Sequence, residues 1–375
     1  MAVVIPHGFE PNYTLGFVRG LRAAGIDVVL VSGDDSAAQA AAAGITQINL
    51  RGNQSEARPL LTKLGGLLRY YARLFRFLHQ QRGEVIHFCG LLDRRLIVFD
   101  GLVLTLALRL CAARYIHTAH NALPHGRHQS RLFRTLYRWI YRLPHTIIAH
   151  SSSVADELHR DFGVSRERLR VISIGLNEEV PATDLSATEA RRRLGLPPAG
   201  PLALFFGKIE PYKGLDLLAA AWARVSSPAA NLVIAGWCPD PALARDLRAR
   251  FGIEPGRDRV HWREGFVPNE EVGLLLGAAD VVVLPYRRIS QSGVIFLCLR
   301  FGVPIVATRV GSMADFIDAE SGLLAAPEDP GALAAALDQV FAEPDRFDRA
   351  RILSRAAPYR WEAQCAQLRD LYHRG

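Results

Sequence analysis

Residues 284–311 read LPYRRISQSGVIFLCLRFGVPIVATRVG, and this stretch decides the fold. The run 280–284 at its start predicts a buried parallel strand, because it is β-branched, apolar and followed by a turn signal. After a short polar loop, the apolar residues 294–300 predict a helix that ends at Gly302. Residues 305–307 predict the next strand. The helix N-terminus of such a unit offers unpaired N–H groups and a partial positive charge, which suit a phosphate.

Length and composition place the chain among globular proteins. At 375 residues it is too long for one ordinary core, so we expect two domains. No apolar run reaches the roughly 18–20 residues that a membrane span needs, and no basic leader precedes the first apolar strand, so we expect no secretory signal. The five cysteines are scattered without zinc or disulfide spacing, which favours a reducing cytoplasm.

The charge is concentrated in the first half of the chain. Residues 1–195 hold 25 Lys and Arg against 16 Asp and Glu, whereas residues 196–375 hold 20 against 21. A basic half beside a near-neutral half predicts that the first half meets an anionic partner. Nucleic acid, a membrane surface and a phosphorylated substrate are all candidates.

The first half opens with a strand at 3–5, a helix at 13–24 and a strand at 27–31, which together predict a doubly wound parallel sheet. Ligands of such sheets bind outside the carboxyl ends of the strands. His7 and His120 each follow a predicted strand end. His120 is a candidate for contact with a sugar hydroxyl. His7 is a candidate for contact with a ligand, and a loop residue that makes only a local hydrogen bond is at least as good an interpretation of it. The strand histidines His87 and His117 are interpreted as core residues.

Two basic amphipathic helices are expected in this half, at 59–82 and 127–142. In the second helix Arg127, Arg131, Arg134, Arg138 and Arg142 share one stripe, while Leu132, Phe133, Leu136 and Ile140 share another. Such helices suit an anionic bilayer surface. The alternative is an ordinary surface helix that packs on its own sheet.

The second half begins after a connector predicted at 175–200, where Pro, Gly and charged residues are frequent. A strand at 202–206 leads into the loop 207–214, and a helix follows at 215–225. Lys208 and Lys213 lie in this one loop. Two cations so close together are costly unless an anion lies between them, so the pair predicts an anion site.

Several motifs now occur in a fixed order along the second half. They are FFGKIEPYKG from residue 205, WREGFV from 262, ADVVVLPY from 279, FGVPIVATRVG from 301 and YRWEAQCAQLRDLY from 359. In this order they resemble the nucleotide-sugar-dependent glycosyltransferases of the GT-B fold, most of all the retaining glycosyltransferase family 4. The similarity spans nearly the whole chain.

The resemblance implies a fold and a domain plan. The fold is α/β, with two Rossmann-like doubly wound domains facing a cleft. Residues 1–178 would form an acceptor-binding domain and residues 199–358 a nucleotide-sugar-binding domain. The last helix, within 359–375, would pack back onto the first domain.

The resemblance also implies site residues. The expected catalytic residues are His120, against the donor sugar, and Lys208 and Lys213, on the donor diphosphate. The other expected donor contacts are Gly207, Glu264, Phe266, Val267, Gln291, Ser292, Gly293 and Val294. The expected acceptor or cleft contacts are His7, Gly8, Asn12 and Asn121. The expected membrane contacts are Arg127, Arg131, Arg134 and Arg138.

One departure from the family pattern concerns two acidic residues eight positions apart. Counted back from Gly302, their places hold Ile289 and Leu297. The outer acid usually faces the sugar and the inner one usually grips the ribose. The Gln291-Ser292-Gly293 loop is therefore expected to supply phosphate and sugar contacts in their place.

The resemblance implies a glycosyltransferase that moves a sugar from a UDP- or GDP-linked donor to a hydroxyl acceptor, with retention and without a metal or cofactor. The expected acceptor is a lipid-linked saccharide of bacterial polysaccharide assembly. The protein would then be cytoplasmic and peripheral on the inner face of the plasma membrane. An inactive regulatory homologue and a nucleotide-sugar epimerase are the alternatives. A nucleic-acid partner is not expected, because no recognition motif is present.

Overall fold

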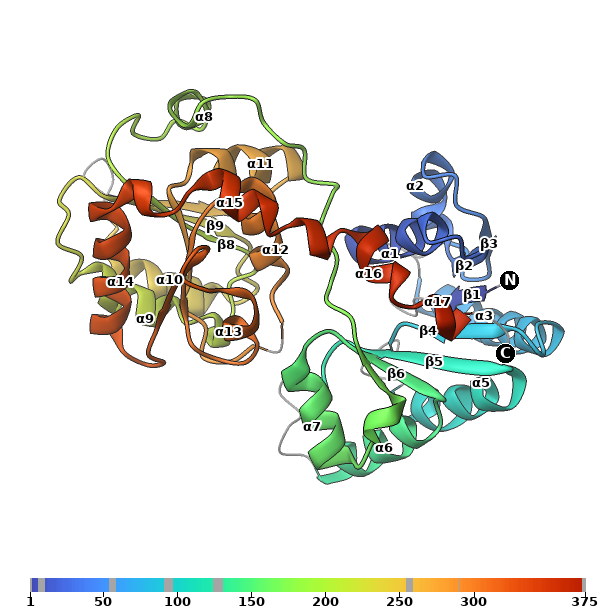
Figure 1. Cartoon of the computed structure of the whole chain (residues 1–375). Helices are drawn as coiled ribbons and strands as arrows, with labels where there is room; N and C mark the ends of the chain where they lie inside the picture. The colour runs from blue at the N-terminus through green and yellow to red at the C-terminus, as the bar shows by residue number, and fades with distance from the viewer. Residues whose placement is uncertain are drawn as a thin grey trace. The chain divides into compact units, whose positions relative to one another are not determined.

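The computed structural model describes residues 2–5, 11–53, 59–90, 97–123, 131–253, 259–289 and 291–372. The chain divides into two compact units (Figure 1). The N-terminal unit comprises Met1–Gly175 and Tyr359–Gly375, and the C-terminal unit comprises Leu176–Pro358. Each unit has one parallel sheet with helices on both faces, so the predicted fold class of two Rossmann-like α/β domains is confirmed.

The N-terminal unit contains a seven-stranded sheet in the order β3-β2-β1-β4-β5-β6-β7. Every described pair of neighbouring strands is parallel. The central strands are apolar and fully buried, as expected for a sheet covered on both faces. The strands are β1 (Ala2–Ile5), β2 (Val28–Ser32), β3 (Gln47–Asn49), β4 (Val85–Phe88), β5 (Arg114–Ala119), β6 (Thr146–Ala149) and β7 (Leu169–Val171).

Helices cover both faces of this sheet and form three clusters of buried residues with it. One core joins the sheet to α1, α2 and the C-terminal helices, and a second joins it to α3 and α5. Helices α6 and α7 pack together at the β5–β6 side. The helices are α1 (Pro11–Ala23), η1 (Asp34–Ser36), α2 (Ala37–Ala42), α3 (Leu60–Gln80), α4 (Ile97–Phe99), η2 (Asp100–Leu104), α5 (Thr105–Cys111), α6 (Arg131–Arg142), α7 (Ser152–Phe162) and η3 (Arg166–Arg168).

The C-terminal tail is fastened to the N-terminal unit by Trp361. A Cβ atom built on Gly16 would lie 2.0 Å from Trp361 Nε1, and one on Gly20 would lie 2.6 Å from the Trp361 carbonyl oxygen. Because Gly16 and Gly20 of α1 have no side chains, the Trp361 indole and backbone fit against this helix. The tail is two short helices, α16 (Trp361–Ala366) and α17 (Arg369–Tyr372), where the sequence predicted one.

The C-terminal unit contains a six-stranded sheet in the order β10-β9-β8-β11-β12-β13, and its described strand pairs are all parallel. The strands are β8 (Leu202–Phe206), β9 (Asn231–Gly236), β10 (Val260–Glu264), β11 (Val281–Leu284), β12 (Ile305–Thr308) and β13 (Gly322–Ala325). Glu264, an expected donor contact, is the last residue of β10.

Helices α9, α10 and α14 lie on one side of the six-stranded sheet, and α11, α12 and α15 lie on the other (Figure 1). The helices are α8 (Ala187–Arg193), η4 (Pro211–Lys213), α9 (Leu215–Trp222), α10 (Pro241–Phe251), α11 (Asn269–Ala278), α12 (Gly293–Phe301), α13 (Met313–Phe316), α14 (Pro330–Ala342), η5 (Pro344–Arg346), α15 (Arg349–Ser354) and η6 (Ala357–Tyr359).

The structure decides two local features that the sequence leaves open. Helix α7 is capped by Ser151 rather than by Ser153, and the Ser151 hydroxyl accepts from the Val154 N–H. Either serine satisfies the sequence preference for a cap, and only the backbone distinguishes them. The connector predicted at 175–200 packs on the C-terminal unit, because Arg191 is buried there and forms a 2.7 Å ion pair with Asp280.

Candidate functional site

The strand order of the C-terminal unit reverses between β8 and β11. From β8 the chain runs outward to β9 and β10, whereas β11 begins a run to β12 and β13 on the other side. The loops after β8 and β11 therefore emerge side by side. In open α/β sheets this switch point is where ligands bind, outside the carboxyl ends of the strands.

Backbone contacts hold the two loops together. Gly214 has φ +67°, and a Cβ atom there would lie 1.9 Å from the Pro285 carbonyl oxygen. Glycine is therefore required both for the left-handed backbone and for the close approach. The Arg287 N–H donates to the Tyr212 carbonyl at 2.8 Å, and the Arg287 guanidinium forms a two-pronged ion pair with Asp216, with nitrogen–oxygen distances of 2.6 and 2.8 Å.

Lys213 brings a buried ammonium group to this switch point. Only 8% of the residue is exposed, and its Nζ donates to the Tyr286 hydroxyl at 2.9 Å. The same Nζ lies 4.3 Å from the Tyr286 ring centroid and 5.6 Å from that of Tyr212. Among the described residues, no carboxylate lies within ion-pair distance of it. A buried cation without an anionic partner is costly, so the position favours an anionic ligand.

Lys208, the other predicted lysine, is in a different situation. It is exposed, and its Nζ forms a 2.8 Å ion pair with Glu210. Its charge is thus already balanced, and its nitrogen also lies 5.8 Å from the Trp237 ring. Both lysines come from one loop, but the structure buries only Lys213.

The N-terminus of α12 supplies a second group of polar atoms. The Ser292 hydroxyl makes no capping bond although the residue is buried, and a Cβ atom on Gly293 would meet nothing within 4 Å. Both side-chain amide atoms of Gln291 are shielded from solvent and lack a hydrogen-bond partner among the described residues. Val294 is buried in the first turn.

Ile289 and Leu297, which stand where the family pattern has two acidic residues, cannot supply polar side-chain contacts to a donor. Leu297 is buried inside α12, and Ile289 is half-buried. A Cβ atom on Gly311 would lie 1.7 Å from the Ile289 carbonyl oxygen, so the loop after β12 packs closely on this segment. The Thr308 hydroxyl donates to the Tyr286 carbonyl as well. The loop after β12 thus joins those after β8 and β11.

Exposed aromatic side chains follow the neighbouring strands β9 and β10. Phe266 is 87% exposed and Trp237 is 53% exposed. Between them, Glu264 forms a 2.7 Å ion pair with Arg248, and Val267 is half-buried. Trp237 is not among the residues predicted from the sequence, although an aromatic residue directly after a strand end is a usable signal. Gly207 and Gly236 touch here, since a Cβ atom on Gly236 would lie 1.9 Å from the Gly207 carbonyl oxygen.

The N-terminal unit has its polar centre at the ends of β5 and β6. His120 and His150 follow these strands, and His120 Nδ1 lies 3.2 Å from His150 Nε2. Burial lowers the pKa of His120 to about 4 and that of His150 to about 3, so both imidazoles are neutral at pH 7. The Tyr13 ring packs edge-on against both.

The other two histidines of this region belong to the core, as the sequence predicted. His87 and His117 are buried, and desolvation lowers the pKa of each to about 3. His87 Nε2 lies 2.7 Å from the Thr118 hydroxyl, and its Nδ1 contacts the Tyr372 hydroxyl of the tail.

The remaining predicted residues have mixed positions. His7, Gly8, Arg127 and the side chain of Asn12 lie outside the described residues. Asn121 is half-buried, and its carbonyl accepts from the Tyr141 hydroxyl at 3.2 Å. On α6, Arg131 is exposed, whereas Arg134 lies 3.7 Å from the Asp161 carboxylate and Arg138 donates to the Asp161 carbonyl.

Within the described ranges, no group of three or more His, Cys, Asp and Glu side chains is placed to hold a metal ion. In the same part of the chain, every helix is too short or too polar to span a bilayer.

Models of two protein families match the two halves of the chain. Residues 11–180 match the family described as Glycosyltransferase Family 4, and residues 200–343 match Glycosyl transferases group 1. Among curated proteins, the chain is 29% identical over 295 residues to a D-inositol 3-phosphate glycosyltransferase of Corynebacterium urealyticum, which covers 73% of this chain and 69% of that protein. A protein of the same description from Xylanimonas cellulosilytica is 30% identical over 234 residues, or 60% of this chain and 56% of that one.

The fold has close counterparts among solved structures. Sucrose-phosphate synthase from Thermosynechococcus elongatus superposes with a TM-score of 0.75 at 22% identity, covering 99% of this chain and 98% of that one. Anabaena Alr3699/HepE in complex with UDP-glucose superposes with a TM-score of 0.74 at 16% identity, covering 99% of both chains. At these identities the likeness concerns the fold.

Proposed function

Because this chain belongs to the glycosyltransferases of the GT-B type, we propose that it transfers a sugar from a nucleoside diphosphate sugar to an acceptor hydroxyl. The observation that carries the proposal is the buried ammonium of Lys213 at the switch point of the C-terminal sheet, with no carboxylate partner in the described part of the chain. The donor diphosphate is the anion that this position suits.

The diphosphate would also meet the start of α12. The side-chain amide of Gln291 has no hydrogen-bond partner among the described residues, and the first-turn N–H groups of α12 begin at Gly293. A helix N-terminus adds a partial positive charge. Since Gly293 has open space around its Cα atom, a phosphate can approach the backbone closely there.

Catalysis then consists of stabilising the leaving group. The bond from the anomeric carbon to the diphosphate oxygen breaks, and the acceptor oxygen bonds to that carbon. The acceptor proton passes to a phosphate oxygen. The negative charge that develops on the diphosphate is opposed by Lys213 and by the N–H groups of α12, so we propose that no metal or other cofactor is needed. Acceptor deprotonation by the leaving group is consistent with retention.

The nucleobase end of the donor would lie at β9 and β10. Phe266 and Trp237 are large exposed aromatic side chains beside the switch point, and such rings provide stacking surfaces for a base. Anabaena HepE is described with UDP-glucose, so a uridine donor is a reasonable first candidate, with GDP-sugars as the second. Lys208 would add a surface charge close to the ring of Trp237.

We propose His120 as the group that faces the donor sugar from the N-terminal unit. As a neutral imidazole it can bond a sugar hydroxyl without adding a charge near the oxocarbenium-like carbon. The acceptor would be a saccharide carried on a membrane lipid, as in bacterial polysaccharide assembly. The protein would then work on the inner face of the plasma membrane.

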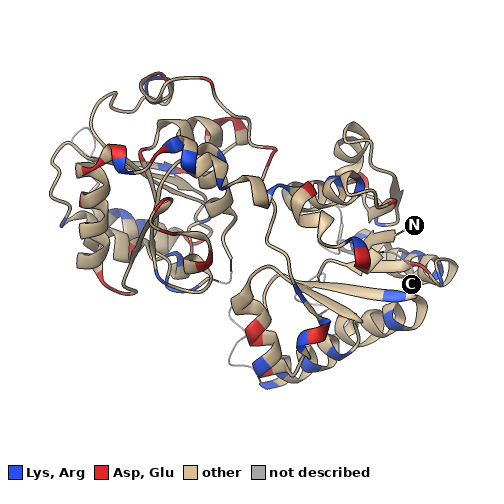
Figure 2. Cartoon of the chain, in the orientation of Figure 1, with Lys and Arg blue, Asp and Glu red and all other residues tan. Residues whose placement is uncertain are grey.

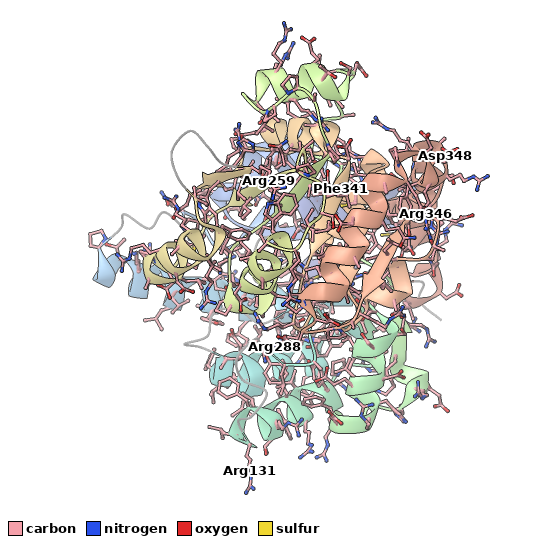
Figure 3. The ribbon with its side chains drawn as sticks, turned by 90° about the vertical axis from the view of Figure 1, so that its left-hand side faces the viewer. Arg131, Arg259, Arg288, Phe341, Arg346 and Asp348 are labelled. Carbon is pink, nitrogen blue, oxygen red and sulfur yellow. The ribbon has the colours of Figure 1, made fainter. Side chains whose placement is uncertain are left out.

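A thermal-shift screen against UDP-, GDP- and ADP-sugars tests donor binding. One base should raise the midpoint in a concentration-dependent way, since a ligand that binds only the native state stabilises it. Lys213→Met should abolish both the shift and sugar transfer while keeping the unfolding midpoint, because the substitution removes an uncompensated buried charge. The matched control is Arg346→Ala, a cation of the same unit on the surface at η5 (Figure 3).

The missing acidic pair favours one alternative, an inactive homologue that binds the donor and regulates another enzyme. A donor-induced shift without transfer to any acceptor would support this alternative. Turnover of the donor without an acceptor would instead indicate an epimerase or hydrolase. Full transfer activity in Lys213→Met would overturn the proposed donor site.

A further inference from the structure

The helical run 97–111, formed by α4, η2 and α5, buries polar residues and exposes large apolar ones. Its inward side carries polar or small residues among its apolar ones: Asp100, Gly101 and Thr105 are buried. Its outward side carries six large apolar side chains that are between 39% and 70% exposed, namely Val98, Phe99, Leu102, Val103, Leu106 and Leu110. We call these six residues the apolar stripe.

Hydrogen bonds hold this run in its rotation. Tyr71 of α3 donates its hydroxyl to the Asp100 carboxylate at 2.5 Å, and the Thr105 hydroxyl donates to the Gly101 carbonyl at 2.5 Å. Gly101 also faces α6, since a Cβ atom there would lie 2.9 Å from Ile140 Cδ1. These contacts fix the polar side of the run in the interior. The apolar stripe on the opposite side therefore stays exposed.

The neighbouring helices also carry exposed apolar side chains. Helix α3 packs against α5, and α6 packs against η2. Helix α3, the run 97–111 and α6 therefore form one layer. Leu68 of α3 and Leu132 of α6 are each 72% exposed, and Trp139 of α6 is 39% exposed. Leu132 was expected on the apolar stripe of α6, but of the four residues of that stripe only Leu136 and Ile140 are buried. A gathering of exposed apolar side chains on packed neighbouring helices is typical of an interaction site.

Positive charge surrounds the apolar stripe. Residues 59–142 hold 14 Lys and Arg but only 3 Asp and Glu, and one of these acids is the buried Asp100. Figure 2 shows blue positions along α6. Figure 3 shows the Arg131 side chain extending away from the protein at the start of α6. The exposed arginines of the layer are Arg69, Arg73 and Arg76 on α3, Arg109 on α5, and Arg131, Arg138 and Arg142 on α6.

We propose that this layer is a docking surface for an anionic phospholipid bilayer, in which the apolar stripe enters the headgroup and acyl boundary and the flanking arginines meet lipid phosphates. Peripheral proteins combine buried apolar area with attraction to anionic lipid in this way. Trp139 suits the boundary itself, because indole has an apolar body and a polar N–H. The proposal rests on the proposed function only in that a lipid-linked acceptor gives the docking a purpose.

Charge complementarity selects a bilayer over a second copy of this chain. In a two-fold dimer the same patch meets itself, so the arginines of one copy would face those of the other. Like charges opposed across an interface are unfavourable, and the layer offers no exposed acid in its described part to pair with them. A bilayer rich in phosphatidylglycerol has the opposite sign.

The test is co-sedimentation of the whole chain with vesicles of phosphatidylglycerol mixed with phosphatidylcholine, and with vesicles of phosphatidylcholine alone. The variant Leu106→Ser/Leu110→Ser should bind the mixed vesicles at least about tenfold more weakly, since each buried leucine contributes more than a factor of ten to partitioning. Arg131→Glu/Arg142→Glu should lose binding as well, and added salt should weaken the wild type. The matched control is Leu353→Ser, which removes an exposed leucine from α15 of the other unit and should bind as the wild type does.

Two results would overturn the proposal. One is equal vesicle binding by the wild type and Leu106→Ser/Leu110→Ser. The other is a wild type that does not bind vesicles but elutes as a dimer, while Leu106→Ser/Leu110→Ser elutes as a monomer. That result would make the layer an interface between copies. Because the substituted side chains are exposed, the variants should keep the wild-type unfolding midpoint. The donor-induced thermal shift of the same variants reports the proposed function separately, and it should be unchanged.

Discussion

His150 Nε2 lies 3.2 Å from His120 Nδ1, and His150 Nδ1 lies 2.8 Å from the Ile172 carbonyl oxygen. A carbonyl only accepts, so His150 carries its proton on Nδ1. Its Nε2 is then an acceptor, because burial keeps the imidazole neutral. His150 therefore helps to orient the His120 ring, which also makes a hydrogen bond with the Cys89 backbone. The carbonyl end of β7 thereby influences a residue at the end of β5.

We predict that His150→Leu lowers the kcat of sugar transfer by about 10- to 100-fold with little change in the donor KM, because a displaced His120 loses alignment and not ground-state binding. The same variant leaves the Ile172 carbonyl unpaired, at a cost of about 1–3 kcal/mol. His150→Gln should recover much of the rate, since one amide can donate to the carbonyl and accept from His120. Equal losses in both variants would show that His150 only fills space.

Gln291→Leu separates ligand binding from stability. In the free protein the glutamine amide is shielded and unpaired within the described structure, so an apolar side chain of similar size should leave the free energy of unfolding equal or higher by about 1–3 kcal/mol. Donor binding should weaken, because the amide is proposed to bond the diphosphate or the sugar. Urea unfolding and donor titration measure the two effects. A destabilised variant with normal donor affinity would assign Gln291 a structural role.

The framework of this protein could be predicted because its strands are continuous apolar runs. Val281–Leu284 and Ile305–Thr308 are buried on both faces of a parallel sheet, and that burial leaves a clear pattern in the sequence. The helix from Gly293 ends at Gly302 with φ +67°, as its glycine predicted. Strand order places the loops at one edge, so the proximity of Lys213 to the α12 loop followed from topology.

What the sequence could not predict depends on side-chain partners. Nothing local distinguishes Lys208 from Lys213, yet Glu210 pairs with the first and Tyr286, over seventy positions away, contacts the second. The apolar stripe of 97–111 escaped notice for a similar reason, because its many leucines are typical of a buried helix. Only the packing of Asp100 against Tyr71 reveals which side is exposed.

Gly16→Ala should destabilise the protein, because the new Cβ atom would lie 2.0 Å from Trp361 Nε1 and the indole is fully enclosed. Overpacking of this kind typically costs about 1–3 kcal/mol. Urea unfolding followed by tryptophan fluorescence measures the change. The matched control is Gly65→Ala in α3, where a Cβ atom meets nothing within 4 Å. That variant should gain about 0.5–1 kcal/mol through helix propensity, and an unchanged Gly16→Ala would mean that the tail adjusts freely.

The ion pair of Asp216 with Arg287 predicts a pH effect on the C-terminal unit. Hydrogen bonding from Arg287 lowers the pKa of Asp216 below its ordinary value of 3.8. A carboxyl whose folded pKa is depressed contributes stability above its unfolded pKa, and that contribution is lost as pH falls through the folded value. Asp216→Asn should therefore destabilise the protein at pH 7 and much less below about pH 3. Asp246→Asn is the matched control, since its pair with Arg250 is fully on the surface and such pairs contribute little. Urea unfolding midpoints at the two pH values measure the difference. If Asp216→Asn lowered the free energy of unfolding equally at both pH values, the aspartate would act through its shape rather than its charge.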